Sequence, residues 1–184
     1  GIDPLHTNDI EEALYDTPFW KSGDLFISIK YLSAIIHYRP NQDKVIQVIK
    51  GPFWYQHDVD LHPDGSLTIF NNNTPNILGE VRSNVLKYDF QTKSFSVMFT
   101  SMNFITRAEG LHQILSDGAM LVESQRQGKL MLFDEKGDLL WSYTNVDSKK
   151  RKFTRAALSW ASVIEDPDHI SSIKKNIESL KCEN

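Results

Sequence analysis

A glycine-led strand pattern occurs three times in this chain of 184 residues. The glycines are Gly23, Gly65 and Gly118, and each opens an apolar stretch rich in Val, Ile, Leu and Phe. They lie 42 and 53 residues apart, and two further apolar segments follow each stretch before the next unit begins. Similar units of short strands at a period of about 40–50 residues are typical of a β-propeller. The pattern therefore predicts an all-β protein.

The residues between the apolar stretches suit tight turns. Asp64-Gly65 and Asp117-Gly118 place glycine where a turn needs a positive φ, and Lys136-Gly137-Asp138 predicts the next hairpin. We therefore expect antiparallel blades of four strands. Propellers contain about four to eight blades, and this chain supplies about three to four, so we expect it to form the C-terminal part of a longer propeller.

The last residues have a different pattern. Asp166-Pro167-Asp168 suits the start of a helix, because proline is favoured in the first turn. The apolar residues that follow share one helical face: Ile170, Ile173, Ile177 and Leu180. We therefore expect a propeller portion over residues 1–165, followed by an amphipathic helix and tail over residues 166–184.

Composition and missing motifs exclude several functions. The 20 basic and 24 acidic residues leave a net charge of −4, so the chain lacks the basic surface that a nucleic-acid partner requires. No apolar stretch reaches the roughly 18 residues that span a bilayer. There is no glycine-rich phosphate loop, no zinc-binding cysteine spacing and no Gly-x-Ser-x-Gly motif. We expect no cofactor and no bound metal.

Histidines precede the glycine-led strands. They are His6, His57 and His112, and the innermost strands that would carry them line the channel of a propeller. We expect the three to share one site, where imidazole could act as a nucleophile, a proton carrier or a metal ligand. Asp58 or Asn8 could fix the tautomer of a neighbouring histidine. The alternative is that each histidine is a hydrogen-bonded structural group.

A cation and several aromatic residues accompany these histidines. Lys30 ends the first glycine-led strand and could bind an anion. Trp54 and Tyr55 directly precede Gln56-His57 and could form the wall of a pocket for an aromatic substrate, although packing between blades is the alternative. The remaining histidines receive no chemical role: His37, His62 and His169.

The order of these segments resembles that of the arylsulfotransferase family of the bacterial aryl-sulfate type. The resemblance is carried by Asp3-x-x-His6-x-Asn8, the strand ending in Lys30, Gln56-His57-Asp58 and Phe70-Asn71-Asn72, over about residues 3–73. It implies a six-bladed propeller in the periplasm or outside the cell. The implied activity moves a sulfuryl group from an aryl sulfate to a phenol without a nucleotide donor.

The resemblance also implies roles for individual residues. His57 corresponds to the family's transient sulfuryl acceptor and His6 to the histidine beside the sulfate, while Lys30 stands where the family has an arginine that contacts the sulfate. The catalytic candidates are thus His57, His6 and Lys30, and the candidates for substrate binding are Asn8, His112, Trp54 and Tyr55.

Two other functions remain open. Lysine lacks the planar, two-pronged grip of arginine, which favours a non-catalytic propeller that binds an anionic or aromatic ligand or a partner protein. A histidine-ligated metal site is the other alternative, which a neighbouring lysine disfavours. In either case an open sheet edge is expected to be covered by missing blades or by a partner chain.

Overall fold

The computed structural model describes residues 3–75, 81–106, 109–147 and 154–179, and it consists mainly of three antiparallel sheets of four strands. The first sheet contains β1 (Thr7–Glu12), β2 (Leu25–Ile29), β3 (Ala34–Arg39) and β4 (Lys44–Lys50). The middle sheet contains β5 (His57–Leu61), β6 (Ser66–Pro75), β7 (Val81–Asp89) and β8 (Ser94–Met98). The third sheet contains β9 (Leu111–Ile114), β10 (Met120–Ser124), β11 (Lys129–Phe133) and β12 (Leu139–Thr144).

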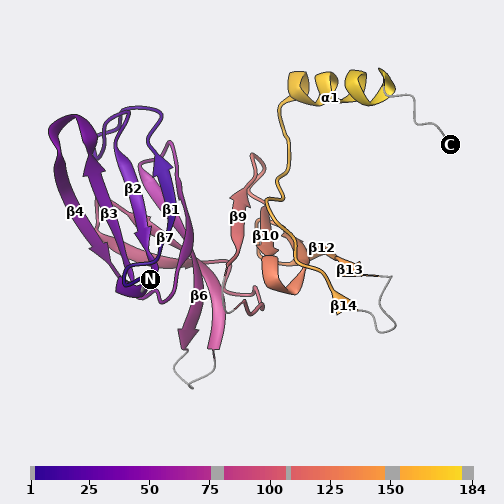
Figure 1. Cartoon of the computed structure of the whole chain (residues 1–184), viewed down its shortest axis with the longest axis horizontal. Helices are drawn as coiled ribbons and strands as arrows, with labels where there is room; N and C mark the ends of the chain where they lie inside the picture. The colour runs from indigo at the N-terminus through magenta and orange to yellow at the C-terminus, as the bar shows by residue number, and fades with distance from the viewer. Residues whose placement is uncertain (1–2, 76–80, 107–108, 148–153, 180–184) are drawn as a thin grey trace.

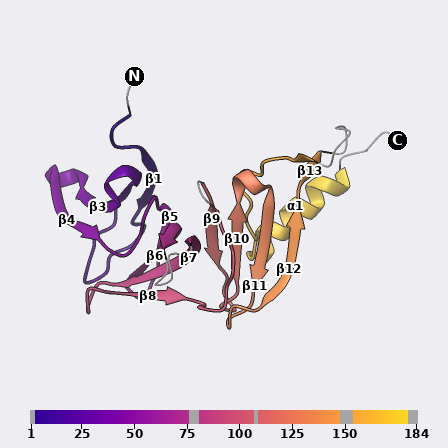
Figure 2. The same ribbon diagram turned by 90° about the horizontal axis from the view of Figure 1, so that it is seen from below.

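Each sheet has its strands in chain order, so every connection within a sheet joins neighbouring strands. The three sheets follow one another from the indigo N-terminal end of the chain to the orange part (Figures 1 and 2). A short strand pair, β13 (Val146–Asp147) and β14 (Thr154–Arg155), and one helix, α1 (Pro167–Ser179), complete the described chain. The predicted all-β class, the antiparallel four-stranded sheets and the C-terminal helix are thus confirmed.

The repeated glycines occupy the turns that the sequence assigned to them. Gly23, Gly65 and Gly118 each precede the second strand of a sheet, with φ of 83°, 77° and 86°. A residue with a Cβ is strained at these angles, which explains the recurrence of glycine at this point of each unit.

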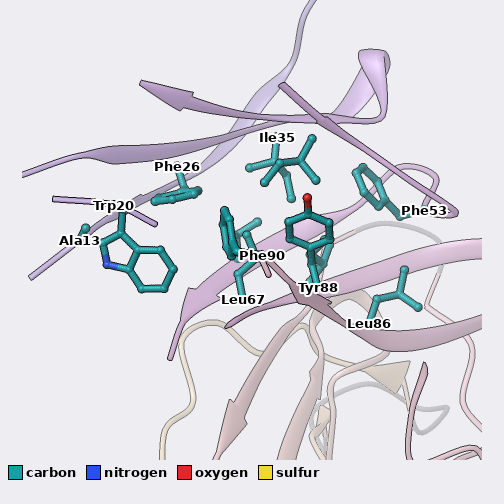
Figure 3. Close-up of a cluster of buried hydrophobic side chains, with 12 residues drawn as sticks. Ala13, Trp20, Phe26, Ile35, Phe53, Leu67, Leu86, Tyr88 and Phe90 are labelled. Carbon is teal, nitrogen blue, oxygen red and sulfur yellow. The ribbon is translucent and has the colours of Figure 1, made fainter. Parts of the chain in front are cut away.

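The first and middle sheets enclose the larger hydrophobic core. Trp20, Phe26 and Ile35 from the first sheet and its turns face Leu67 and Phe90 from the middle sheet, and all are almost fully buried (Figure 3). The edge of Trp20 meets the ring of Phe90 at a centroid distance of 5.3 Å. Such edge-to-face pairs add to the stability that burial provides, so these two sheets are held face to face.

A second core joins the middle sheet to the third. Phe70 and Val85 from the middle sheet pack with Met120 and Val122 of β10 and with Phe133 of β11. Because each sheet buries one face against the next, the three innermost strands β1, β5 and β9 are brought to the same region of the molecule (Figure 2).

Side chains of one innermost strand also bind the backbone of the next. Asp9 accepts a hydrogen bond from the amide of Val59 at 2.7 Å, and Asp58 accepts one from the amide of His112 at 2.6 Å. Gln113 bonds both the amide and the carbonyl of Val163, at 2.8 and 2.9 Å. Residues 156–165 therefore lie beside β9 much as β9 lies beside β5.

The helix α1 buries none of its side chains in the described part of the chain. Ile170 and Ile173 are partly covered and Ile177 is 61% exposed, while Leu180 lies outside the described residues. Within the described residues, no helix has the length and apolarity to cross a bilayer.

Candidate functional site

A cavity of about 590 Å³ opens between the innermost strands of the three sheets. Its wall includes His6 and Asn8, which precede or begin β1, His57 and Asp58 from β5, and Leu111 from β9. The remaining lining residues are Thr7, Asp9, Ile10, Glu11, Val59, Asp60, Glu109, Gly110, Gln125 and Trp160. The structure thus brings His6 and His57, which are 51 positions apart in sequence, to one common space.

His57 is held by one ring nitrogen only. Its Nδ1 lies 2.6 Å from Oδ1 of Asn72 and 3.1 Å from the carbonyl oxygen of Tyr55. Nε2 has no hydrogen-bond partner among the residues that the structure describes. Burial lowers the pKa of His57, and the nearby charge of Lys30 lowers it further. The ring is therefore neutral near pH 7, with a lone pair on Nε2.

An irregularity of the strand accounts for the way His57 is presented. The pairing between β5 and β6 shifts register between His57 and Val59, and the intervening Asp58 has a φ of 45°. A bulge of this kind redirects side chains and is common beside active sites. It allows His57 and Asp58, which are adjacent in sequence, to line the same cavity.

The first sheet has a similar bulge at Asn8. Its register with β2 shifts between Thr7 and Asp9, and Asn8 donates its Nδ2 to the carbonyl oxygen of Gln56 at 2.6 Å. Oδ1 of Asn8 is buried without a hydrogen-bond partner in the described chain. This oxygen is thus an unpaired buried acceptor in a residue of the cavity wall.

His6 lies at the more open side of the cavity, with its side chain 38% exposed. Its Nδ1 lies 2.9 Å from Oδ2 of Asp3, and its backbone amide donates to the other oxygen of the same carboxylate at 2.8 Å. Because the carboxylate accepts from Nδ1, the ring carries its proton there and turns Nε2 outward. His6 and His57 thus have the same tautomer, set by different partners.

Lys30 is close to His57 but outside the cavity lining. Its Nζ lies 5.8 Å from the ring centre of Tyr31 and 5.9 Å from that of Tyr55, and no carboxylate within the described chain forms an ion pair with it. Burial lowers the pKa of Lys30, and the charge of Arg126 lowers it further. Cation–π contacts stabilise such an ammonium group only modestly, so it remains available to an anion.

Trp54 and Tyr55 form an aromatic group beside Lys30 and do not line the cavity themselves. Trp54 stacks on Tyr55 at a centroid distance of 5.9 Å and is 50% exposed, and the edge of Tyr55 meets Tyr31 at 6.2 Å. The backbone carbonyl of Tyr55, rather than its ring, takes part in holding His57.

Carboxylates gather at another part of the cavity wall. Burial raises the pKa of Asp9 to about 6, that of Glu11 to about 7 and that of Asp60 to about 6. Repulsion by the nearby carboxylate of Asp58 contributes to each of these shifts, because like charges disfavour ionisation. This wall can therefore exchange protons near neutral pH.

His112 does not line the cavity. It is completely buried behind the carboxylates, with Nδ1 2.6 Å from Asp58 and Nε2 2.7 Å from the hydroxyl of Thr68. Burial alone would lower the pKa of His112, but the charges of Asp58 and Asp60 outweigh burial and raise it. The imidazolium is thus an internal counter-ion for the acidic wall.

Strand register explains why His112 and His57 differ. His57 pairs with Phe70, which is five positions after Gly65. The residue five positions after Gly118 is Glu123, and its partner is Leu111. His112 instead pairs with Val122 and occupies the place that the buried Val59 occupies in the middle sheet. The β9–β10 pairing has no bulge, and so the histidine after Leu111 points into the protein.

Asp58, Asp60 and His112 could hold a metal ion, since one ligand atom from each lies within 4.8 Å of the others. Both nitrogens of His112, however, are already engaged by Asp58 and Thr68. A protonated imidazole cannot ligate a metal, so the ring would first have to release its protons and its partners.

The three histidines without an assigned role have structural contacts. Buried His37 bonds Asp24 at 2.8 Å, and Arg39 grips the same carboxylate with two nitrogens at 2.7 Å each. His62 bonds the hydroxyl of Thr68 at 2.8 Å, and His169 lies on the exposed helix α1.

Several residues of the site were missed by sequence reasoning. Asn72 lies in β6, Trp160 lies beyond the third sheet, and the carboxylates of Asp9 and Glu11 lie on β1. Asn72 does stand seven positions after its glycine, as Lys30 and Gln125 do, and all three lie close to the cavity. That repeated position is a signal that the sequence contained.

Left-handed backbone recurs where the chain enters each innermost strand, and again in the segment that lies beside β9. His6, Tyr55, Glu109 and Trp160 have φ of 51°, 54°, 62° and 61°. Residues other than glycine adopt this region at a cost, and such residues cluster at functional sites. Three of the four, His6, Glu109 and Trp160, line the cavity, and Tyr55 precedes the lining residue His57 by two positions.

Repeated antiparallel four-stranded sheets around a cavity with an oriented histidine define a class: an all-β protein of repeated units with polar side chains gathered at their inner ends. The chain belongs to the arylsulfotransferase family, because the family model "Arylsulfotransferase (ASST)" matches residues 2–146. The predicted family is thus confirmed. A search of curated proteins found no significant match.

Three solved structures illustrate the wider similarity. A protein of unknown function from Bacteroides caccae has a TM-score of 0.48 at 11% identity, over 65% of this chain and 45% of its own. Virginiamycin B lyase from Staphylococcus aureus has a TM-score of 0.44 at 11% identity, and the match covers 70% of this chain and 40% of the lyase. An auxiliary nutrient binding protein from Bacteroides thetaiotaomicron has a TM-score of 0.44 at 13% identity, and the match covers 73% of this chain and 38% of that protein. In each case the match covers less than half the length of the solved protein.

Proposed function

We propose that this chain carries the nucleophile of a sulfotransferase that moves a sulfuryl group from an aryl sulfate to a phenol. The observation that carries the proposal is the state of His57, whose Nδ1 is held by two oxygen acceptors while Nε2 lies unpartnered at a cavity. A neutral imidazole with one free nitrogen is the form that attacks an electrophile. Family membership supports sulfur as the target atom.

The reaction has two balanced steps. In the first, Nε2 of His57 forms a bond to sulfur, the bond between sulfur and the aryl oxygen breaks, and the aryloxide leaves with both electrons and takes up a proton. In the second, the oxygen of a phenol bonds to sulfur, the Nε2–sulfur bond breaks, and the phenol's proton passes to a base. No cofactor or metal takes part, and the neutral ring is restored.

Lys30 supplies positive charge beside the sulfuryl oxygens in this proposal. His6 and Asn8 contact the substrate from the cavity wall. Fixed donors aimed at developing charge account for much of enzymatic catalysis. The aromatic group of Trp54 and Tyr55 binds the aryl ring. His112 acts on the site indirectly, by keeping Asp58 in place.

The three sheets are, in this proposal, blades of a propeller with about six blades, followed by the helix and tail of residues 166–184. The remaining blades or a partner chain cover the open edge of the outer sheets. Family membership supports a periplasmic or secreted location.

A non-catalytic binding role is the second candidate. Lys30 replaces the arginine that the resemblance implies, and a lone ammonium group beside Tyr31 and Tyr55 would bind an anionic aromatic ligand without holding its sulfate in one orientation. This candidate predicts binding of aryl sulfates without turnover.

The test compares full-length protein with its His57→Ala and His62→Ala variants on a nitrophenyl sulfate donor and a phenol acceptor. We expect His57→Ala to abolish turnover, and His62→Ala, which changes a histidine of the same sheet outside the cavity, to retain it. Mass spectrometry at alkaline pH should find a sulfuryl adduct on the peptide that contains His57. Binding of several aryl sulfates with neither turnover nor adduct would replace the enzyme proposal by the binding role.

A further inference from the structure

The side chain of Asn72 is completely buried between His57 and the loop that leads into β9. Its Oδ1 lies 2.6 Å from Nδ1 of His57. Its Nδ2 donates to the carbonyl oxygens of Glu109 at 2.7 Å and Thr106 at 3.3 Å. All polar atoms of the amide group therefore have partners.

These partners leave the amide only one orientation. A backbone carbonyl oxygen can only accept a hydrogen bond, so the atom of Asn72 that faces Glu109 and Thr106 must be the NH₂ group. The amide oxygen must then face His57. Turning the amide over would set an oxygen against two carbonyl oxygens in a buried place, where unpaired polar atoms are costly.

The orientation of the amide in turn decides where His57 carries its proton. Oδ1 of Asn72 and the carbonyl oxygen of Tyr55 both require a donor, and both lie beside Nδ1. Nδ1 must therefore be protonated, and in the neutral ring Nε2 must be the bare nitrogen. Asp58 and Asn8, which the sequence suggested as partners of a neighbouring histidine, have other contacts: Asp58 bonds Nδ1 of His112, and Asn8 bonds the carbonyl oxygen of Gln56.

We propose that Asn72 is the positioning residue of the site: it locks His57 in the Nδ1–H tautomer and thereby selects Nε2 as the nucleophile. That Nε2 acts as a nucleophile rests on the proposed function, whereas the tautomer of His57 can be measured without turnover. Asn72 also stabilises the sulfo-histidine, because the ring becomes positively charged once Nε2 is bonded to sulfur and Nδ1–H then donates a stronger hydrogen bond.

The first measurement is the tautomer of His57 in the intact protein, from long-range ¹H–¹⁵N NMR spectra assigned by comparison with His57→Gln. We expect an Nδ1–H ring with an unprotonated Nε2 at pH 8. An Nε2–H ring in the unmodified protein would overturn the inference, and this result does not depend on whether any variant folds.

The second measurement uses Asn72→Leu and Asn72→Asp, with Asn71→Ala as the control for loss of a neighbouring buried amide that does not touch His57. We expect Asn72→Leu to give a mixture of tautomers and to lower kcat about tenfold with KM little changed. Asn72→Asp should raise the pKa of His57 and move the acidic limb of the pH–rate profile upward by about one unit. Asn71→Ala should leave the tautomer unchanged.

The possible failures separate the two proposals. An unchanged tautomer and an unchanged kcat in Asn72→Leu would show that the carbonyl of Tyr55 suffices, and the role of Asn72 would be rejected. If the tautomers are as expected but the unmodified protein shows neither turnover nor adduct, the sulfotransferase proposal would be rejected. The positioning role of Asn72 would then stand.

Discussion

Asp58 binds His112 twice, accepting hydrogen bonds of 2.6 Å from both its backbone amide and its Nδ1. The contact joins the innermost strands of the middle and third sheets, and it places a positive charge directly behind the carboxylates of the cavity. Removing one partner of a buried ion pair costs far more than the pair contributes when intact, since the other charge is left unpaired.

Replacing Asp58 by Asn should therefore lower the free energy of unfolding by about 3 kcal/mol. The pKa of His112 in the folded protein lies above its unfolded value, so its charge stabilises the fold fully below pH 6.5 and this contribution is lost as the pH rises through the folded pKa. The effect of Asp58→Asn should thus be larger at pH 6 than at pH 9, in urea titrations. Asp64→Asn, which removes an exposed pair with Lys87, is the control and should cost under about 1 kcal/mol. An equal loss at both pH values would contradict the charged state of His112.

Replacing Glu11 by Gln should stabilise the protein at alkaline pH. The pKa of Glu11 is raised to about 7 by burial and by Asp60, from 4.5. Because the pKa of Glu11 is higher in the folded than in the unfolded protein, the unfolded chain releases this proton first as the pH rises. The protein therefore loses stability as the pH rises from 4.5 to about 7. We expect Glu11→Gln to raise Tm by roughly 3 °C at pH 8 and to change it little at pH 4.5. The exposed neighbour Glu12→Gln serves as control, and a Tm increase at acidic pH alone would refute the expectation.

Changing Lys30 should alter both the pKa of His57 and the rate. Its charge lowers the pKa of His57, so Lys30→Ala should raise that pKa, measurable by NMR titration. Because the proposed function places this cation beside the sulfuryl oxygens, its loss should slow transfer about tenfold or more, whereas Lys30→Arg should preserve or raise the rate. Lys44→Ala, on the exposed start of β4, should change neither quantity. If Lys30→Ala left the pKa of His57 unchanged, Lys30 would not act on the site.

Gly110→Ala should be much more damaging than Gly23→Ala, although both glycines have positive φ. At Gly110, with φ of 135°, a Cβ would lie 2.5 Å from the ring of Phe70 and 3.1 Å from the carbonyl oxygen of Glu123. At Gly23, with φ of 83°, it would meet nothing within 4 Å. We expect losses of about 3 and about 1 kcal/mol respectively. Equal losses in urea titrations would mean that backbone angle alone, and not the crowding by Phe70, requires glycine there.

The sequence was sufficient for the elements and their order. Local backbone preference determines the tight turns at Gly23, Gly65 and Gly118 and the start of the helix at its proline. The two-residue period of a strand determines the alternation of apolar residues, and both signals can be read along the chain. The resemblance carried by His6, Lys30 and His57 predicts the family correctly from the sequence alone. The sequence also points to His57 and His6, because His57 begins β5 and His6 directly precedes β1.

Only the tertiary structure decided which of these residues meet. One extra residue at the bulges of Asn8 and Asp58 changes the side of the strand that every preceding side chain faces. In the third sheet the position of His57 is therefore occupied by Leu111 and not by His112. The carboxylates of β1 and Trp160 reach the cavity from separate segments, and Asn72 approaches His57 from β6. Their convergence depends on how whole sheets pack against one another through their apolar faces, and no local pattern along the chain records that packing.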